Sequence, residues 1–463
     1  MNSAWAAMIL TAASMAVAQD GGKQLRELTE KDCLRGFTTK EIPVYKPGEE
    51  ILFQVELGGF AHYDTTGFRL KWERTGDDGR KETGETAIGK PFVYRTSLDR
   101  PGFVRFLGKL VDGRGNPVKR RAPWGSFQPI ECDLGAGVDI LEIRQAVKPP
   151  ADFDVFWQGR KAKLKRVPFL SAGLVRIEGN ERAELFTVKC PCAGGKPVTG
   201  FLTVPVACAQ GKKFPALVSF YGYNASWTRD AWGKPDLAKA KADCLHFAVS
   251  AHGFDLMKNA EYYSGLRKAA ESNGHGYGFD PVQNSDPEKT YYCGMTYRVM
   301  RALEYIKTRP EWNGKELKVT GGSMGGMQSV WAAALDPGVT DCEIYIPWNC
   351  DIGGTELGRN RGDWHVKWVP ALGYYDTASM ATRVPESCDV TVTMAGLGDY
   401  ICPPAGVMAF YNNLKCKKTI AFRQNTRHGG YLQPGPVEAF RITGESIREM
   451  TFETARKMTR RGV

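Results

Sequence analysis

Ser323 lies in the segment Gly321-Gly322-Ser323-Met324-Gly325, which has the G-x-S-x-G pattern of a nucleophilic serine. Small residues on both sides of the serine permit the sharp, strained turn that exposes its hydroxyl. An apolar run before the motif predicts a strand, and an Ala-rich run after it predicts a helix. The first amides of such a helix stabilise a negative oxygen nearby. In that context the motif indicates nucleophilic catalysis rather than a glycine-rich packing turn.

A serine needs a base, and the base needs a group that orients it, in the chain order serine, acid, histidine. Asp399 follows a predicted strand that ends at Met394, and His428 follows the next predicted strand. We expect His428 to take the proton of Ser323 and return it to the leaving alcohol, while Asp399 fixes the histidine tautomer. Alone, each would be a turn aspartate or a surface histidine. Their positions after successive strands favour a triad.

The negative oxygen of an acyl-transfer intermediate needs two N–H donors. The amide of Met324, directly after the serine, is the first expected donor. The second should come from the loop after an early strand, and the amide of Tyr223, in the segment 220–224, is our choice.

Strands that alternate with helices must position these side chains. Consecutive prolines at Lys148-Pro149-Pro150 mark a boundary, and a helical pattern with acidic residues in its first turn follows from Ala151. Short apolar runs then predict a mostly parallel sheet that is covered on both faces. These runs are residues 215–220, 245–250, 317–320, 343–346, 390–393 and 419–422.

Residues 19–148 have a different pattern, in which polar and apolar residues alternate in the segments 50–57, 67–72 and 102–107. Period-two alternation between turn signals predicts a small antiparallel, immunoglobulin-like β-sandwich. The expected role of this domain is structural or orienting, and carbohydrate binding through an exposed aromatic such as Tyr63 is the alternative. We therefore predict an α/β-hydrolase catalytic domain over 149–463, preceded by a β-sandwich domain over 19–148.

At these residues the chain resembles the acetyl xylan esterase and cephalosporin C deacetylase family, carbohydrate esterase family seven, of the α/β-hydrolase superfamily. The resemblance covers about residues 150–440 and implies a triad of Ser323, Asp399 and His428, oxyanion donors at the amides of Tyr223 and Met324, and removal of acetyl groups from sugars. The segments that carry it are Pro150-Ala151-Asp152-Phe153-Asp154-Val155-Phe156-Trp157, Tyr221-Gly222-Tyr223-Asn224, Tyr291-Tyr292-Cys293-Gly294, Gly322-Ser323-Met324-Gly325-Gly326, Asp399-Tyr400-Ile401-Cys402-Pro403-Pro404 and His428-Gly429-Gly430.

The chain also departs from that family. Met324 stands where the family usually has glutamine, and a backbone donor survives that change. His252 lies in a segment that is different in the family, where it would line another pocket or, as we expect, be structural. The added sandwich would block the ring-like hexamer that members often form, so homo-oligomer formation stays open.

The segment 347–375, between a predicted strand and the Asp399 loop, is rich in aromatic residues. Tryptophan faces stack on sugar rings, so Trp348, Trp364 and Trp368 are candidate substrate-binding residues. The alternative is that they pack a small cap onto the domain.

The composition of the chain indicates its cellular location and limits the classes of partner. Residues 1–18 carry no charge and end in Ala16-Val17-Ala18, which predicts a signal peptide cleaved near Ala18 and a secreted or periplasmic protein. No later apolar run is long enough to span a membrane. The net charge is +11, but the sequence contains no long run of basic residues. This favours a solvated basic surface over nucleic-acid binding.

Twelve cysteines in an exported chain permit disulfides, and Cys33 with Cys132 is a candidate pair. Cys190-x-Cys192 has no matching second pair and the six histidines are scattered, so we expect no metal site and no cofactor. The sequence thus predicts a secreted serine esterase that acts on acetylated oligosaccharides or polysaccharides. A peptidase or another acyl hydrolase on the same fold, or a non-catalytic carbohydrate-binding protein, are the alternatives.

Overall fold

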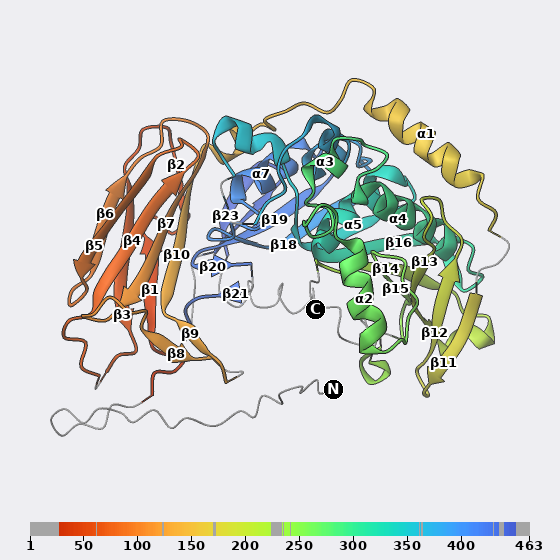
Figure 1. The fold of residues 1–463 in the computed structure, drawn as a ribbon, viewed down its shortest axis with the longest axis horizontal. Helices are drawn as coiled ribbons and strands as arrows, with labels where there is room; N and C mark the ends of the chain where they lie inside the picture. The colour runs from red at the N-terminus through yellow and green to blue at the C-terminus, as the bar shows by residue number, and fades with distance from the viewer. Residues whose placement is uncertain are drawn as a thin grey trace, which may run out of the picture.

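The computed structural model describes residues 27–450, with the exception of 62, 123–124, 170–172, 224–233, 235, 241, 361, 363, 429 and 435–438. The predicted signal peptide, His62 and Asn224 lie outside the described residues. Figure 1 shows two parts side by side: a set of strands formed by the N-terminal third of the chain, and a larger part in which helices pack on a long sheet.

Two sheets make up the N-terminal sheet region, residues 27–138. One sheet has the order β1-β3-β6 and the other has the order β2-β10-β7-β4-β5. Neighbouring strands are antiparallel except for β2 and β10, which are parallel. The strands predicted at 50–57, 67–72 and 102–107 are confirmed as β3, β4 and β7. The bounds are Cys33–Thr38 (β1), Val44–Tyr45 (β2), Ile51–Gly58 (β3), Arg69–Gly76 (β4), Lys81–Ala87 (β5), Phe92–Thr96 (β6), Gly102–Val111 (β7) and Glu131–Val138 (β10), with a separate hairpin of β8 (Lys119–Arg121) and β9 (Phe127–Pro129).

Side chains from both sheets share one apolar core. Alternate residues of β3 are buried, as the period-two pattern predicted, and Phe53 and Val55 are fully buried. The ring of Phe53 stacks on that of Phe106 in β7, with 5.7 Å between the centroids. Burying these faces against each other stabilises both sheets.

Cys33 and Cys132 belong to different sheets of this region. Cys33 is on β1, while the Cys132 sulfur on β10 fills the space beside Gly108 of β7. Both are buried, and they are free thiols like the other cysteines of the described residues, so the candidate Cys33–Cys132 disulfide is wrong.

One sheet dominates the C-terminal α/β region, residues 153–450. In the described residues it has eleven strands, ordered β11-β12-β13-β15-β14-β16-β17-β18-β19-β22-β23. The strands from β15 to β19 are parallel, and those at both ends are antiparallel. All six predicted strands are confirmed. The bounds are Gly173–Gly179 (β11), Ala183–Cys190 (β12), Val198–Pro205 (β13), Phe214–Phe220 (β14), Leu245–Val249 (β15), Trp312–Ser323 (β16), Asp341–Pro347 (β17), Asp389–Gly396 (β18), Lys418–Arg423 (β19), Ala439–Thr443 (β22) and Ser446–Glu449 (β23).

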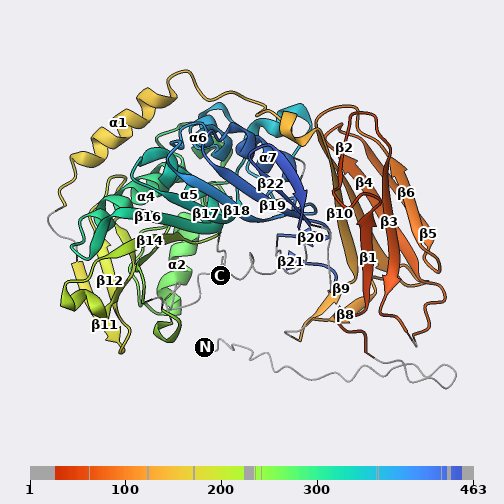
Figure 2. The same cartoon turned by 180° about the vertical axis from the view of Figure 1, so that it is seen from behind.

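Helices α4, α5, α6 and α7 contact one another in that order along the sheet, as Figure 2 shows. Helix α1 begins at Phe153, directly after Asp152, which confirms the helix predicted beyond the paired prolines. None of the described helices is long and apolar enough to cross a membrane. The bounds are Phe153–Lys165 (α1), Ala260–Ala270 (α2), Pro281–Asn284 (α3), Tyr291–Lys307 (α4), Met324–Leu335 (α5), Thr377–Ala381 (α6) and Pro404–Asn413 (α7).

The parallel strands end at one edge of the sheet, and their loops meet there. Strand β14 ends at Phe220, β16 at Ser323, β17 at Pro347, β18 at Gly396 and β19 at Arg423. Each predicted site residue follows or ends one of these five strands.

Candidate active site

Ser323 ends strand β16 and directly precedes helix α5. Its backbone has φ 58° and ψ −122°, a conformation that a residue with a side chain rarely adopts. Such strain persists only where the surrounding structure enforces it, and it is concentrated at functional sites. The predicted strand, serine and helix are therefore present in the order that an exposed nucleophile requires.

Glycines around Ser323 allow three backbones to approach one another. A Cβ added to Gly325 would lie 2.2 Å from the carbonyl oxygen of Phe220 at the end of β14. A Cβ added to Gly326 would lie 2.3 Å from the carbonyl oxygen of Ile346 in β17. Real Cβ atoms essentially never come so close, so the start of α5 can pack between these strands only with glycine at both positions.

Asp399 and His428 are brought together across the ends of β18 and β19. Nδ1 of His428 lies 2.8 Å from Oδ2 of Asp399, and the Asp399 carboxylate is buried. Its other oxygen accepts the backbone N–H groups of Ile401, at 3.0 Å, and Cys402, at 2.9 Å. If the neutral imidazole donates from Nδ1, its Nε2 is left to accept a proton. Both oxygens of Asp399 are therefore used to hold the loop and the histidine.

Cys402 connects this pair to Ser323. Its sulfur lies within 4.8 Å of a ligand atom of Asp399 and of His428. Burial raises the pKa of the Cys402 thiol well above its ordinary value, and a hydrogen bond with the Ser323 side chain opposes that shift. Between the described side chains of Ser323 and His428 themselves there is no direct hydrogen bond. Such contacts are often loose before substrate binds.

Asp399, Cys402 and His428 also form the one group of three potential metal ligands found in the described residues. A thiol must lose its proton to bind a metal, whereas burial favours the protonated thiol of Cys402. The Asp399 carboxylate is already occupied by two N–H groups and the imidazole. These residues fit proton transfer better than metal binding.

The loop after β14 lies directly beside the nucleophile. A Cβ added to Gly222 would be 3.8 Å from the Cβ of Ser323. The next residue, Tyr223, directly follows this contact, and Met324 is the first residue of α5. Their amides as oxyanion donors stay a prediction.

Trp348 and Trp364 form one wall of this site. Their rings stack with centroids 5.1 Å apart, and the ring of Tyr223 meets Trp364 edge-on at 4.8 Å. The backbone N–H of Trp348 donates to the Ser323 carbonyl at 3.1 Å, which places this wall beside the nucleophile. Trp368 is elsewhere, because its ring packs over Gly353 and Gly373.

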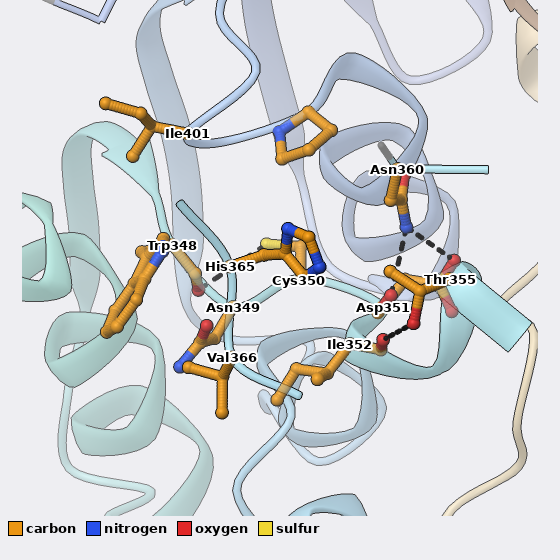
Figure 3. Close-up of a pocket in the computed structure, with 11 residues that line it drawn as sticks. Trp348, Asn349, Cys350, Asp351, Ile352, Thr355, Asn360, His365, Val366 and Ile401 are labelled. Atoms are coloured by element: carbon orange, nitrogen blue, oxygen red, sulfur yellow. Dashed lines mark hydrogen bonds between the residues drawn. The ribbon is translucent and has the colours of Figure 1, made fainter. Parts of the chain in front are cut away.

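A small pocket lies between the segment after β17 and the Asp399 loop. Figure 3 shows Trp348 and Ile401 on one side of it and His365 over Cys350. Asn360 closes the far side by donating to the backbone and the carboxylate of Asp351. The pocket is thus continuous with the tryptophan wall and reaches the loop that carries Asp399.

His252 is structural, as we expected. It is fully buried, its Nδ1 lies 2.8 Å from the Tyr291 hydroxyl, and its ring stacks on Phe254. Burial, with the charges of Arg298 and Lys196, holds the pKa of His252 well below its ordinary value. It stays neutral, and its ring meets that of Tyr277 edge-on at 4.8 Å.

Several residues of the site were not predicted. Tyr277 stacks on Tyr223 at 4.1 Å, and Phe279 meets Trp364 at 5.0 Å. The sequence signal for these two residues is the alternation of glycine and aromatic residues over 274–279. Glycine permits a close approach here, because a Cβ on Gly276 would lie 2.7 Å from the Tyr223 hydroxyl. In the sequence, Cys402 stands out only as a member of the segment 399–404, which carries the family resemblance.

Comparison with known proteins places the chain in a family. The family described as Acetyl xylan esterase (AXE1) matches residues 138–355 and 360–438, so the match begins where β10 ends. Acetyl esterase Axe7A of Xylanibacter ruminicola is 25% identical over 341 residues, which cover 71% of each chain.

Two solved structures share the fold. The acetyl xylan esterase from Paenibacillus sp. R4 is 23% identical, with a TM-score of 0.51 over 63% of this chain and 93% of its own. Acetyl xylan esterase 1 from Thermoanaerobacterium sp. JW/SL YS485 is 22% identical, with a TM-score of 0.50 over 62% and 92%. The family match covers more than half of the chain, and the protein therefore belongs to the acetyl xylan esterase family of carboxylic ester hydrolases, with a fold of the α/β-hydrolase type.

Proposed function

We propose that this protein is a secreted serine esterase that hydrolyses acetyl esters on carbohydrates, with Ser323, His428 and Asp399 as its triad. The observation that carries the proposal is the strained backbone of Ser323 at the start of α5, next to the pair formed by the buried Asp399 and the half-buried His428. Family membership supports the acetyl ester as substrate.

The proposed reaction has two halves. Ser323 Oγ attacks the acetyl carbonyl carbon while His428 Nε2 takes the hydroxyl proton, and Asp399 stabilises the imidazolium through Nδ1. The amides of Met324 and Tyr223 donate to the oxyanion. The C–O bond to the sugar then breaks, and His428 returns the proton to the departing sugar hydroxyl. Water repeats the sequence on the acyl-enzyme and releases acetate.

The aromatic wall supports a sugar as the alcohol part of the ester. Trp348 is buried and supports the ring of Trp364, which is half-buried and meets Tyr223 edge-on. Trp364 is therefore the ring that would contact the apolar face of a sugar. Trp368 is assigned to packing, which was the alternative for all three tryptophans.

The proposal also includes the division of the whole chain into a signal peptide and two domains. Residues 1–18 act as a signal peptide cleaved near Ala18, residues 19–148 form an immunoglobulin-like β-sandwich domain, and residues 149–463 form the catalytic domain. Two apolar cores support this division, although Phe103, Ile140 and Ile143 of the first segment pack into the core of the α/β region.

Acetate release tests the proposal directly. The purified protein and Ser323→Ala are compared on acetylated xylo-oligosaccharides and on a simple aryl acetate. Release from both substrates, abolished by the substitution, is the expected result. Turnover of the aryl acetate alone would keep the serine mechanism and reject the sugar ester, leaving peptides or other esters as substrates. Undiminished activity of Ser323→Ala would reject the mechanism itself.

A further inference from the structure

We propose that Asp133, in the N-terminal sheet region, is a positioning residue for catalysis that fixes the two loops carrying Asp399 and His428. This role rests on the proposed function, since it requires that pair to be catalytic. It assigns to the added N-terminal strands a direct part in assembling the active site.

Asp133 reaches the histidine loop through an ion pair. It lies on β10 and is fully buried. Its Oδ2 accepts from Nε of Arg427, the residue before His428, at 2.6 Å. Glu131 on the same strand accepts from the other side of that guanidinium, at 2.5 Å. The arginine that precedes the base is thus held by two carboxylates of another part of the chain.

Further bonds fasten the same loop to β10. The backbone N–H of Asp133 donates to Oδ1 of Asn425 at 2.8 Å. Gln424 exchanges two hydrogen bonds of 2.8 Å with the backbone of Gly135. Strands β10 and β20 (Thr426–Arg427) lie side by side in both views, as Figures 1 and 2 show.

The Asp399 loop packs on the same strand. A Cβ added to Gly398 would lie 2.7 Å from the Cβ and from the carbonyl oxygen of Asp133, so the loop backbone touches this residue directly. Arg105 of β7 completes the contact. It pairs with both oxygens of Asp133, at 2.6 and 2.7 Å, and its guanidinium lies 4.2 Å from the ring centroid of Tyr400.

The Asp133 carboxylate binds Arg427 of one loop directly and reaches the other loop through Arg105, which lies over Tyr400, so its loss should disturb the distance between the acid, the base and Ser323. A displacement of about 1 Å at a catalytic group costs on the order of 100-fold in rate. The sugar site on the tryptophan wall comes from other elements. We therefore expect Asp133→Asn to lower kcat by about 10- to 100-fold while KM for the aryl acetate stays within about threefold.

A matched control separates positioning from stability. Asp78 forms a similar buried bidentate pair with Arg74, at 2.7 Å for both bonds, within the N-terminal sheet region. Asp78→Asn should lower the thermal midpoint of the full chain as much as Asp133→Asn but leave kcat unchanged. If Asp133→Asn fails to fold, Arg105→Gln, at a partly exposed position, tests the same contact more mildly.

The outcomes are distinct. A fall in kcat for Asp133→Asn or Arg105→Gln, with KM and the Asp78 control preserved, supports the positioning role. Wild-type kcat in the Asp133 variant, or an equal loss in the Asp78 control, overturns it. Ser323→Ala and His428→Ala are assayed in parallel: if either keeps wild-type activity, the proposed function fails whatever the Asp133 variant does.

Discussion

The side chain of Gln328 holds the backbone of Tyr221. Its Nε2 donates to the Tyr221 carbonyl at 3.2 Å and to the Met324 carbonyl at 3.1 Å, and the residue is buried. One amide therefore ties the loop after β14 to the first turn of α5. These two segments carry the proposed oxyanion donors, Tyr223 and Met324.

Replacing Gln328 with methionine keeps the volume and removes the donor. Without it the Tyr221 loop is free to move away from Ser323, and one oxyanion donor is weakened. Loss of such a donor typically costs about 3 kcal/mol, or roughly 100-fold in kcat, and a displaced donor should cost a part of that, about tenfold. Steady-state kinetics on an aryl acetate measures the change.

A half-buried amide in another part of the domain, that of Asn412, provides the comparison. Asn412 donates to the carbonyls of Ile140 and Ile143, and Asn412→Ala should reduce stability while kcat is retained. Equal kcat values for Gln328→Met and the wild type would remove Gln328 from the oxyanion arrangement.

Asp399→Asn tests the acid. An amide in this place still receives an N–H at one oxygen but offers its own NH2 to the histidine, so the imidazole is turned to the wrong tautomer. We expect kcat to fall by about 10³- to 10⁴-fold with little loss of stability. Asp389→Asn, at the other end of β18 in an exposed pair with Lys417, should retain activity. A loss below tenfold for Asp399→Asn would point to a different acid.

The sequence was most informative where local pattern and chemistry coincide. Apolar runs form the central strands, which are buried at every second residue or more over these runs, so each predicted strand is found, and the strand ends fix where Ser323, Asp399 and His428 fall. A strained turn needs small neighbours, so the glycines around Ser323 are readable without a structure.

Long-range contacts left no such local signal. Nothing in the residues around Asp133 indicates that it reaches Arg427, because an ion pair across two sheets depends on how the parts dock. The stacking of Tyr277 on Tyr223 likewise joins segments far apart in sequence. The sequence also left two roles open for Trp368, sugar binding or packing of a cap, and only the structure shows that its ring packs over Gly353 and Gly373.

Removing metal ions should leave activity intact. The thiol of Cys402 is held in its protonated form by burial, and Asp399 is saturated with hydrogen bonds. We therefore expect dialysis against a strong chelator to change kcat by less than twofold, with Ser323→Ala as the inactive reference. Loss of activity that added zinc restores would assign Asp399, Cys402 and His428 to a metal instead.

Gly325→Ala should be strongly disruptive. The new Cβ would overlap the Phe220 carbonyl oxygen at 2.2 Å. Neither atom can rotate away, because the backbone fixes the position of each. Overpacking of this kind costs about 1–3 kcal/mol, and here it also pushes α5 away from β14. The expected result is a lower thermal midpoint together with at least about a tenfold loss in kcat.

Gly159→Ala is its control. Gly159 is exposed in α1 with no other atom near its missing Cβ, so alanine should stabilise the helix by about 0.5–1 kcal/mol without changing kcat. If both alanine variants behave alike, the close approach at the start of α5 does not exist in solution.

Stability should decrease as the pH rises from 5 to 7 because of Asp376. This carboxyl is buried, and burial, reinforced by the nearby Asp351 carboxylate, raises the pKa of Asp376 to about 7. Above its ordinary pKa the unfolded chain releases this proton while the folded chain keeps it, so rising pH favours unfolding until about pH 7, where the folded form ionises too.

Thermal midpoints in buffers from pH 5 to 8 measure this effect. Asp376→Asn removes the titrating group and should reduce the fall in midpoint over that range, by about 3 °C for each kcal/mol of linked free energy. It also loses one backbone acceptor, the oxygen that faces the Ile352 N–H, so its midpoint should be lower at pH 5. Asp389→Asn, which removes an exposed carboxylate, should keep the wild-type slope. An Asp376→Asn slope equal to that of the wild type would mean that Asp376 is already ionised at pH 5, stabilised by the three backbone N–H groups that it accepts.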